Sequence, residues 1–302
     1  MPDGPRIAIV TPRGLISRLW WFFRRAWIAA YEDNCFGVAK GAAYSALLSF
    51  FPVLTTTTAI LVQANAEAVS RVLTRILFQV APPGTQALLR HFLSVQGNRP
   101  ASLLVIATVL SVWAASGAMM SLMEGFQAAY NLPGGRSFLR QRAVAALLVI
   151  CAVAPLVFGS AIILFGTRSE IEIIRWLHLA PVDATQLAFG VVILGRALRD
   201  IAAFGSIMLA AALLYYIGPN RPLRFASVIP GALFATVLWL IATQLFGWYV
   251  RNLANYNVLY GSIAAVIALT VWMYVLAVVT LVGCEFNVII ENDRRVRSNV
   301  RR

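Results

Sequence analysis

The sequence is poor in charge, in histidine and in cysteine. Only 12% of its 302 residues are charged, whereas soluble domains carry about 25%. Its two histidines and three cysteines share no short spacing of the kind that binds zinc or forms a disulfide framework. Phosphate-binding glycine loops and nucleophile-elbow motifs are missing as well. We therefore expect no catalytic residue, no cofactor and no metal, and the composition excludes an ordinary soluble enzyme.

Long apolar runs take the place of charge. Hydrophobic residues make up 60% of the chain, and Arg251 is the only charged side chain between Phe225 and Cys284. About 20 apolar residues cross a bilayer as a helix, because hydrocarbon offers no partner to backbone polar groups. The predicted fold class is therefore all-α: a polytopic membrane protein with six transmembrane helices. The predicted spans are Gly41–Ala64, Ala101–Met123, Ala143–Gly166, Ile201–Gly218, Phe225–Val250 and Ser262–Val282.

The spans form one predicted domain, residues 41–290. Residues 1–40 form a cytoplasmic or interfacial N-terminal segment, and residues 291–302 an arginine-rich cytoplasmic tail. Within the first segment, Leu15–Ala30 mixes tryptophan and phenylalanine with arginine, as helices lying in the headgroup layer do. The sequence does not fix the first residue of the fourth span, because the apolar segment Leu187–Gly195 either belongs to the same helix or lies at the outer surface.

The basic residues lie beside the apolar runs. The chain has 25 Lys and Arg residues against 12 acids, and a net charge of +13. We assign this charge to anionic lipid headgroups and to membrane orientation, and expect no nucleic acid partner. With six spans both termini share one side, and that side carries 16 of the 25 basic residues. The positive-inside rule then places both termini in the cytoplasm.

Two acids fall near the predicted cytoplasmic ends of spans. Glu124 follows the second span and Glu285 the sixth, with Asn287 beside it. An acid near membrane depth is a candidate functional residue, so these three are a candidate coupling or polar site; the alternative is that the acids pair with nearby arginines. Those arginines are candidate contacts for lipid headgroups. They are Arg136, Arg140, Arg142, Arg221 and Arg224.

Three prolines inside the predicted spans, Pro52, Pro155 and Pro230, are candidate helix kinks, since proline removes a backbone donor. After the first of them, Thr55–Thr58 either bond back to their own helix or line a polar cavity. Between the last two spans, a polar and aromatic segment either anchors the outer mouth or recognises headgroups. Its candidate residues are Asn255, Tyr256, Tyr260 and Gly261.

Several short boxes resemble the YihY/BrkB family of bacterial inner-membrane proteins. Ala42–Pro52 (Ala-Ala-Tyr-Ser-Ala-Leu-Leu-Ser-Phe-Phe-Pro) resembles its first-span signature, and Tyr130–Pro133 the loop after its second span. Its Gly-Ala-Glu-hydrophobic-Asn box reads Gly283–Asn287 here, with cysteine for alanine. The resemblance covers residues 40–290. It implies six spans in the bacterial inner (plasma) membrane with cytoplasmic termini. The family was long labelled ribonuclease BN, for which these residues supply no chemistry.

Three functions are compatible with these features. The leading hypothesis is a transporter or flippase-like protein for lipid or another amphipathic envelope molecule, not an enzyme, with anionic membrane lipids as partners. The second is a non-catalytic envelope scaffold or virulence-associated membrane protein; a homo-oligomer fits either. The third is a membrane-bound hydrolase or ribonuclease, which would need His91, His178 or one of the acids for its chemistry.

Overall fold

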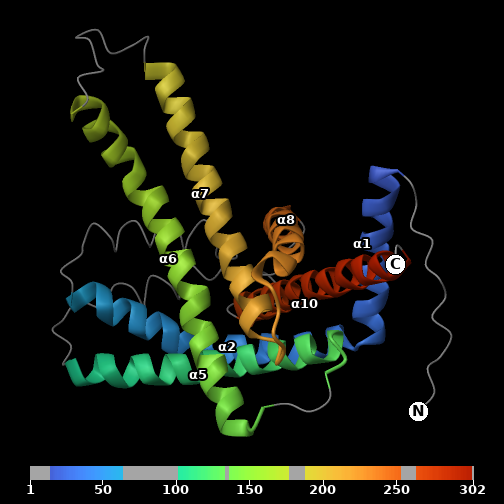
Figure 1. Ribbon diagram of the computed structural model, residues 1–302. Coiled ribbons are helices and arrows are strands. Elements are labelled where there is room, and N and C mark those ends of the chain that lie inside the picture. The colour runs from blue at the N-terminus through green and yellow to red at the C-terminus, as the bar shows by residue number, and fades with distance from the viewer. Residues whose placement is uncertain (1–13, 64–100, 133–135, 177–187, 253–262, 301–302) are drawn as a thin grey trace.

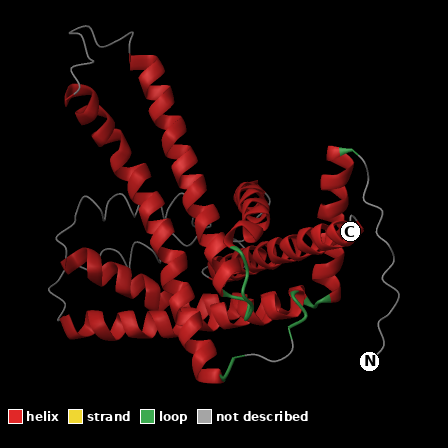
Figure 2. Ribbon diagram, in the orientation of Figure 1, coloured by secondary structure: helices red, strands yellow, loops and turns green. Residues whose placement is uncertain are grey.

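A computed structural model describes residues 14–63, 101–132, 136–176, 188–252 and 263–300. The described residues form seven helices and no strand (Figures 1 and 2). Six of these helices are long and apolar enough to cross a membrane. This confirms the predicted all-α membrane protein with six spans. The helices are α1 (Leu15–Glu32), α2 (Cys35–Gln63), α5 (Ala101–Ala129), α6 (Phe138–Trp176), α7 (Ala188–Ile217), α8 (Phe225–Asn252) and α10 (Ile263–Val300).

Successive spans pack as three antiparallel pairs: α2 with α5, α6 with α7, and α8 with α10. The pairs cross one another and diverge toward one end of the molecule (Figure 1). At the other end α10 packs against α1, α2, α5 and α8. Since α2 begins and α10 ends there, we call this the proximal end and the diverging halves the distal halves.

The buried apolar residues concentrate at the proximal end. The main cluster combines residues from α1 and the start of α2, the end of α5, the end of α7, the start of α8 and the second half of α10. In the distal halves many large apolar side chains are exposed, among them Val109, Phe158 and Leu245. Because lipid chains are themselves apolar, such faces suit a membrane and need no protein cover.

The α2–α5 pair is held by small residues and hydroxyls. Gly41 lies against Ser121, and Gly117 lies against Ser45, so the two backbones approach closely, as small residues allow in membranes. Further along, the Thr56 and Ser111 hydroxyls are 2.7 Å apart. This sequence of small and hydroxyl-bearing residues fixes the pair without large side chains.

All six spanning helices are longer than their predicted spans, and α6 and α10 are the longest. The 39 residues of α6 and the 38 residues of α10 would extend about 58 and 57 Å at 1.5 Å per residue, against a hydrocarbon core of about 30 Å. Helix α10 therefore continues as a helix through most of the predicted tail 291–302. Helix α7 is continuous from Ala188, so the described part of the segment Leu187–Gly195 belongs to the same helix as the fourth span.

The amphipathic helix α1 packs on α10. Phe22, Ala26 and Ala30 are buried at a spacing of four residues, while Trp20 is 66% and Tyr31 78% exposed. One apolar face therefore contacts the protein, and a second aromatic face remains open, with the exposed Arg24 beside it. This is the arrangement expected of a helix lying along a membrane interface.

Candidate functional site

All five residues of the Gly283–Asn287 box in α10 are buried. Because an α-helix turns once in 3.6 residues, five consecutive buried positions mean that this helix is surrounded on every side. Each side chain of the box therefore faces a different neighbour. Phe286, for example, stacks on Phe234 of α8 with ring centroids 4.3 Å apart and meets Phe22 of α1 edge-on at 6.1 Å.

Glycine allows α8 and α10 to touch at the backbone. A Cβ atom on Gly231 of α8 would meet the carbonyl oxygen of Gly283, and one on Gly283 would meet the Tyr215 hydroxyl and the Ala235 Cβ atom. Tyr215 of α7 is fully buried and donates to the Thr280 carbonyl at 2.7 Å. Helices α7, α8 and α10 thus meet at one point where no side chain fits.

The Asn287 side chain forms hydrogen bonds with backbone groups of α8 next to Pro230. Its Oδ1 atom accepts from the Gly231 N–H at 2.6 Å, and its Nδ2 atom donates to the Val228 carbonyl at 3.1 Å. Proline at position 230 interrupts the hydrogen bonds of this first part of α8, and the amide of Asn287 satisfies two groups flanking the interruption. Asn287 therefore bridges α10 to α8.

Glu285 lies on another face of α10, at the corner between α1 and α2. Only 1% of it is exposed, and its Oε1 atom accepts from the Cys35 thiol at 3.6 Å. The Asp33 carboxyl also interacts directly with it. No salt bridge joins Glu285 to an arginine within the part of the chain that the structure describes, so the predicted pairing with arginines does not hold there.

The turn between α1 and α2 positions this corner. The Asp33 N–H donates to the Ala29 carbonyl at 2.8 Å and ends α1, and Asn34 takes a left-handed conformation with φ of 53°. Asparagine tolerates that conformation better than most residues. The tight turn brings both Asp33 and Cys35 to Glu285. Burial raises the pKa of Asp33, contact with Glu285 opposes that rise, and the charge of Glu32 adds to it.

Glu124 is exposed on α5. The structure therefore separates the three residues that the sequence grouped as one polar site: Glu285 faces α1 and α2, Asn287 faces α8, and Glu124 is open to the surroundings.

Three of the five predicted headgroup arginines hold the protein together. Arg136 donates to the carbonyls of Ile217, Gly218 and Pro219 at 3.1–3.4 Å and so caps the end of α7. Burial and the neighbouring Arg140 lower the pKa of Arg136.

Arg142 donates to the Trp113 carbonyl at 2.7 Å and lies over the Trp113 ring at 4.2 Å. Arg221 pairs with Glu291 at 2.8 Å and lies 5.5 Å from the Tyr130 ring. Arg140 and Arg224 are exposed, and neither makes an ion pair with any other described residue.

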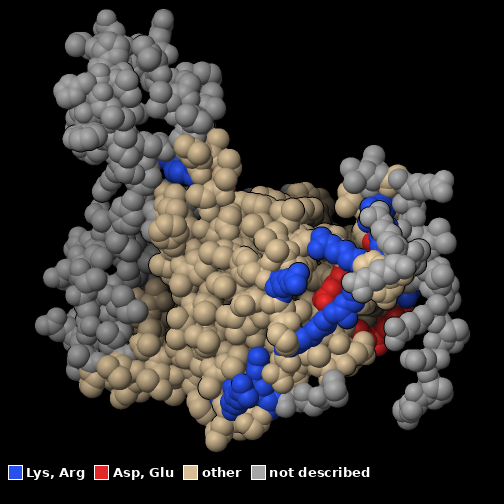
Figure 3. Space-filling model, in the orientation of Figure 1, with Lys and Arg blue, Asp and Glu red and all other residues tan. Residues whose placement is uncertain are grey.

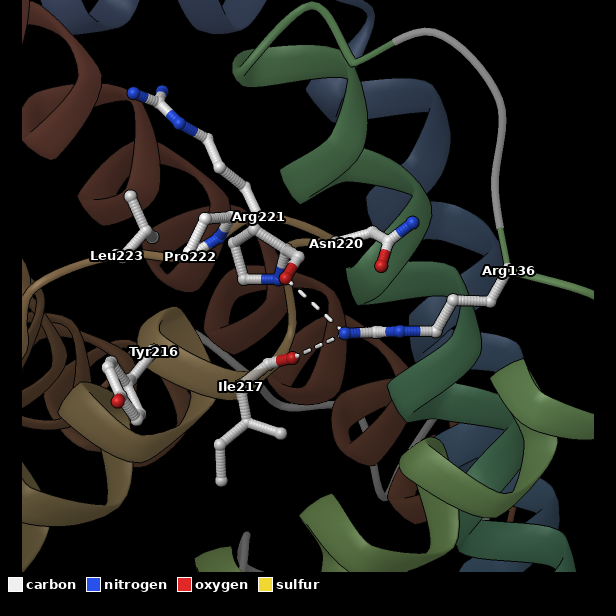
Figure 4. A pocket seen from close by; sticks show the side chains of 8 residues that line it. Arg136, Tyr216, Ile217, Asn220, Arg221, Pro222 and Leu223 are labelled. Atoms are coloured by element: carbon white, nitrogen blue, oxygen red, sulfur yellow. Dashed lines mark hydrogen bonds between the residues drawn. The ribbon is translucent and has the colours of Figure 1, made fainter.

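A pocket opens at the proximal end between the loop before α6 and the turn from α7 to α8. It encloses about 400 Å³. Figure 4 shows Arg136 reaching from the α6 side toward Ile217, with Arg221 on the turn opposite. The lining combines these two arginines and Asn220 with apolar Ile217 and Leu223. Its chemistry suits a ligand that is anionic at one end and apolar at the other.

Most described charges gather around this end of the molecule (Figure 3). Glu291 binds both Arg221 and Arg295, the latter at 2.6 Å. Asp293 likewise binds both Arg18 of α1 at 3.3 Å and Arg297 at 3.0 Å. The C-terminal extension of α10 therefore neutralises part of the basic charge and connects it to α1 and to the α7–α8 turn.

The threonines of α2 mostly bond within the protein. Thr55 donates to the Phe51 carbonyl at 3.0 Å and Thr57 to the Val53 carbonyl at 2.8 Å, which confirms the first of the two alternatives for them, while Thr56 faces Ser111 of α5. Pro52 and Pro155 lie inside α2 and α6 as predicted. The predicted outer-mouth residues and both histidines lie outside the described residues. They are Asn255, Tyr256, Tyr260, Gly261, His91 and His178.

Sequence reasoning missed Asp33, Cys35 and Tyr215. Asp33 and Cys35 are some 250 positions from Glu285 in the chain, and no short-range pattern links them. For Tyr215 the sequence offered one indication: it is a tyrosine, with a polar hydroxyl, within the fourth predicted span. Among the described residues no group of three or more histidine, cysteine or acidic side chains could hold a metal ion.

The comparisons with known proteins agree on one group of relatives. The model of the family "Virulence factor BrkB" matches residues 26–302. The chain is 30% identical to YfkH of Bacillus subtilis, described as ribonuclease-like, over 86% of this chain and 92% of that protein. It is 24% identical to a UPF0761 membrane protein of Tolumonas auensis, over 95% of this chain and 93% of that protein. A similar protein of Chlorobium phaeobacteroides is 26% identical, and the match spans 56% of its length. No solved structure matches significantly.

Proposed function

Because this chain belongs to the BrkB family and is a multi-pass membrane protein, we propose that it moves lipid or another amphipathic envelope molecule. The membrane is the bacterial inner membrane, with both termini in the cytoplasm. The proximal end, with its basic residues, then faces the cytoplasm, in agreement with the positive-inside rule.

The observation that carries the proposal is the pocket beside the α7–α8 turn. It is lined by Arg136, Arg221 and apolar side chains at the level where α7 ends and α8 begins. The Arg136 guanidinium reaches toward Ile217, and that of Arg221 is paired with Glu291. A lipid needs both kinds of contact, since its headgroup is anionic and its chains are apolar. Arg140 and Arg224, exposed near the pocket residues Arg136 and Leu223, extend the positive surface that a headgroup would meet on entry.

Glu285 is the candidate for coupling. A buried ionisable residue in a membrane bundle is costly, and such residues commonly belong to ion or proton pathways. Its position where α1, α2 and α10 meet would allow a change in its charge to alter how these helices pack. Asn287 contributes by holding α8 against α10.

The description of YfkH as ribonuclease-like makes a membrane-bound hydrolase the second candidate. Such an enzyme needs a general base, a nucleophile or a metal in a site open to its substrate. Glu285 is enclosed by its neighbours, and among the described residues Glu124 belongs to no metal-binding group of histidine, cysteine and acidic side chains. We therefore place transport first.

The proposal is tested with purified protein reconstituted in vesicles that contain a fluorescent anionic phospholipid. Transfer of the probe between leaflets is measured by quenching from outside. We expect the wild type to accelerate transfer and the double variant R140E/R224E to lose most of that acceleration. R294E, an exposed arginine on the extension of α10, is the matched control. Equal transfer in vesicles with and without protein would reject transport.

Mass spectrometry of the lipids that co-purify with the wild type complements this assay. Selective enrichment of an anionic lipid over an inner-membrane protein of similar charge supports the headgroup contact. A profile identical to that of the control protein contradicts it.

A further inference from the structure

We propose that Asp33 and Glu285 share one proton, and that loss of this proton releases the end of α1 from the bundle. Release of α1 is separate from lipid transfer and concerns how the N-terminal helix is held. The surroundings of Glu285 are unusual: among the described residues, every polar contact of this 1% exposed carboxyl is with another acidic or weakly acidic group.

The titratable groups that face Glu285 come from four helices or their ends. Asp33 and Glu32 lie at the end of α1, and Cys35 at the start of α2. Tyr130, just after α5, and Cys284 of α10 also feel its charge. No lysine or arginine is among these neighbours within the described part of the chain, so a negative charge on Glu285 would be uncompensated.

Two carboxylates in contact cannot both be ionised in a site closed to water, because their repulsion adds to the cost of burial. One proton between them removes both penalties, since the protonated group donates to the charged one. The more buried carboxyl is the better place for the proton. Asp33, which is half-buried, then carries the charge and accepts from Glu285, while the Cys35 thiol donates to the other side of Glu285 at 3.6 Å.

The shared proton ties α1 to α10 at one end of α1. The other end is held by Arg18, which pairs with Asp293 at 3.3 Å. Between them, α1 packs through apolar side chains: Ala26 and Ala30 are buried, Phe22 contacts Phe286, and Phe23 contacts Phe234. When the proton is lost, the two carboxylates gain by separating into water. The turn at Asp33 is the segment that can move to let them do so.

The sign of the pH dependence follows from the proton held on Glu285, since Asp33 already carries the charge of the pair. The docked pair holds this proton, whereas two carboxyls separated in water lose their protons near their ordinary pKa of about 4. The proton therefore stabilises docking at low pH, and this stabilisation is lost as pH rises and the proton leaves. Docking of α1 is therefore expected to weaken as pH rises. One proton allows the docking equilibrium to change by at most about tenfold per pH unit.

Infrared spectroscopy of the full-length protein in lipid nanodiscs tests the proton directly. A protonated carboxyl that is shielded from water gives its own carbonyl band. We expect this band at low pH, its loss in a single step as pH rises, and its absence in E285Q. The matched control E32Q, which changes the neighbouring exposed acid, should keep it. A band that survives in E285Q, or that disappears in E32Q, overturns the proposal.

Labelling of Cys35 tests the release of α1. Cys35 is 1% exposed, so a thiol reagent reaches it only when the corner opens. In a C151S/C284A background, labelling by a maleimide is followed by mass spectrometry across the pH range of the infrared step. The rate should rise more steeply with pH than it does with E285Q, whose amide donates to Asp33 at every pH. The E285Q rate reports the ionisation of the thiol alone, so equal slopes overturn the proposal.

D33N provides a second comparison if E285Q does not fold, as judged by gel filtration and thermal melting. Its amide can donate to an ionised Glu285, so labelling should again lose the extra pH dependence. Retention of the full wild-type slope in D33N overturns the proposal. None of these readouts uses lipid transfer, and failure of the transport proposal would leave them interpretable.

Discussion

The proximal end and the distal halves of the same helices both contain long apolar stretches, but they are packed in opposite ways. At the proximal end, Leu281 is 1% exposed, and the polar groups of Asn287 and Tyr215 are hydrogen-bonded. In the distal halves, Val109 and Leu245 are each 61% exposed. In a bilayer an exposed leucine costs little, because lipid is as apolar as leucine. An unpaired polar group costs several kcal/mol. Small and polar residues therefore specify the packing here, and large apolar ones mark only the spans.

The largest expected effect comes from enlarging a glycine at the α8–α10 contact. In G283L the new side chain would collide with the Tyr215 hydroxyl and with Ala235, and α7 and α8 would have to separate from α10. Overpacking ordinarily costs about 1–3 kcal/mol, occasionally more, but here three helices would have to separate, and we expect loss of folding. Thermal melting in detergent measures it. The control is G205L on α7, where an added Cβ meets nothing within 4 Å. Equal melting temperatures would contradict the close contact.

The second prediction compares one leucine from each region. L281A removes a 1% exposed side chain at the proximal end, and L245A removes one that is 61% exposed in a distal half. Truncating a buried leucine costs about 2–5 kcal/mol, whereas an exposed position changes stability by about 0.5 kcal/mol or less. The free energy of unfolding in mixed micelles should therefore fall for L281A alone. A large loss in L245A would mean that another protein surface covers this face.

The spans could be predicted from the sequence because their signal is local. The predicted span Phe225–Val250 nearly coincides with α8, Phe225–Asn252. The packing of the helices could not be predicted, since it depends on contacts such as Gly231 with Gly283 that join distant parts of the chain. The arginines show the same limit: the positive-inside rule predicts their side of the membrane, but nothing local distinguished Arg136, which caps α7, from exposed Arg140.

The sequence grouped Glu285 and Asn287 as one candidate polar site near the cytoplasmic ends of the spans. The structure shows both side chains buried and facing different helices. Residues two apart on a helix point about 200° from each other, and this geometry sends Asn287 to α8 and Glu285 to the α1–α2 corner. The partners Asp33 and Cys35 could not be found because the contact joins the two ends of the chain.

The third prediction concerns polar groups at the proximal end. N287A leaves the Gly231 N–H and the Val228 carbonyl buried without their partner. Each unsatisfied group costs about 1–3 kcal/mol, so we expect a loss of about 2 kcal/mol or more in the free energy of unfolding. N287D should recover part of it only at low pH, where the protonated carboxyl accepts from the Gly231 N–H and donates to the Val228 carbonyl. N292A, at an exposed position on the same helix, is the control. A loss in N292A as large as that in N287A would contradict the role of the bridge.

The smallest expected effect is that of the ion pair between Arg221 and Glu291, 2.8 Å apart but only partly buried, with side chains 26% and 21% exposed. Such pairs contribute about 0–1 kcal/mol, and Glu291 keeps a second partner in Arg295 at 2.6 Å. A double-mutant cycle of R221A and E291A, read by thermal melting, should give a coupling energy of about 0.5 kcal/mol that falls with added salt. The same salt should leave the cost of N287A unchanged, since that bridge is buried and neutral. If the ion pair proved stronger than the Asn287 bridge, electrostatics at the rim would hold the proximal end, and the buried polar contacts would be secondary to it.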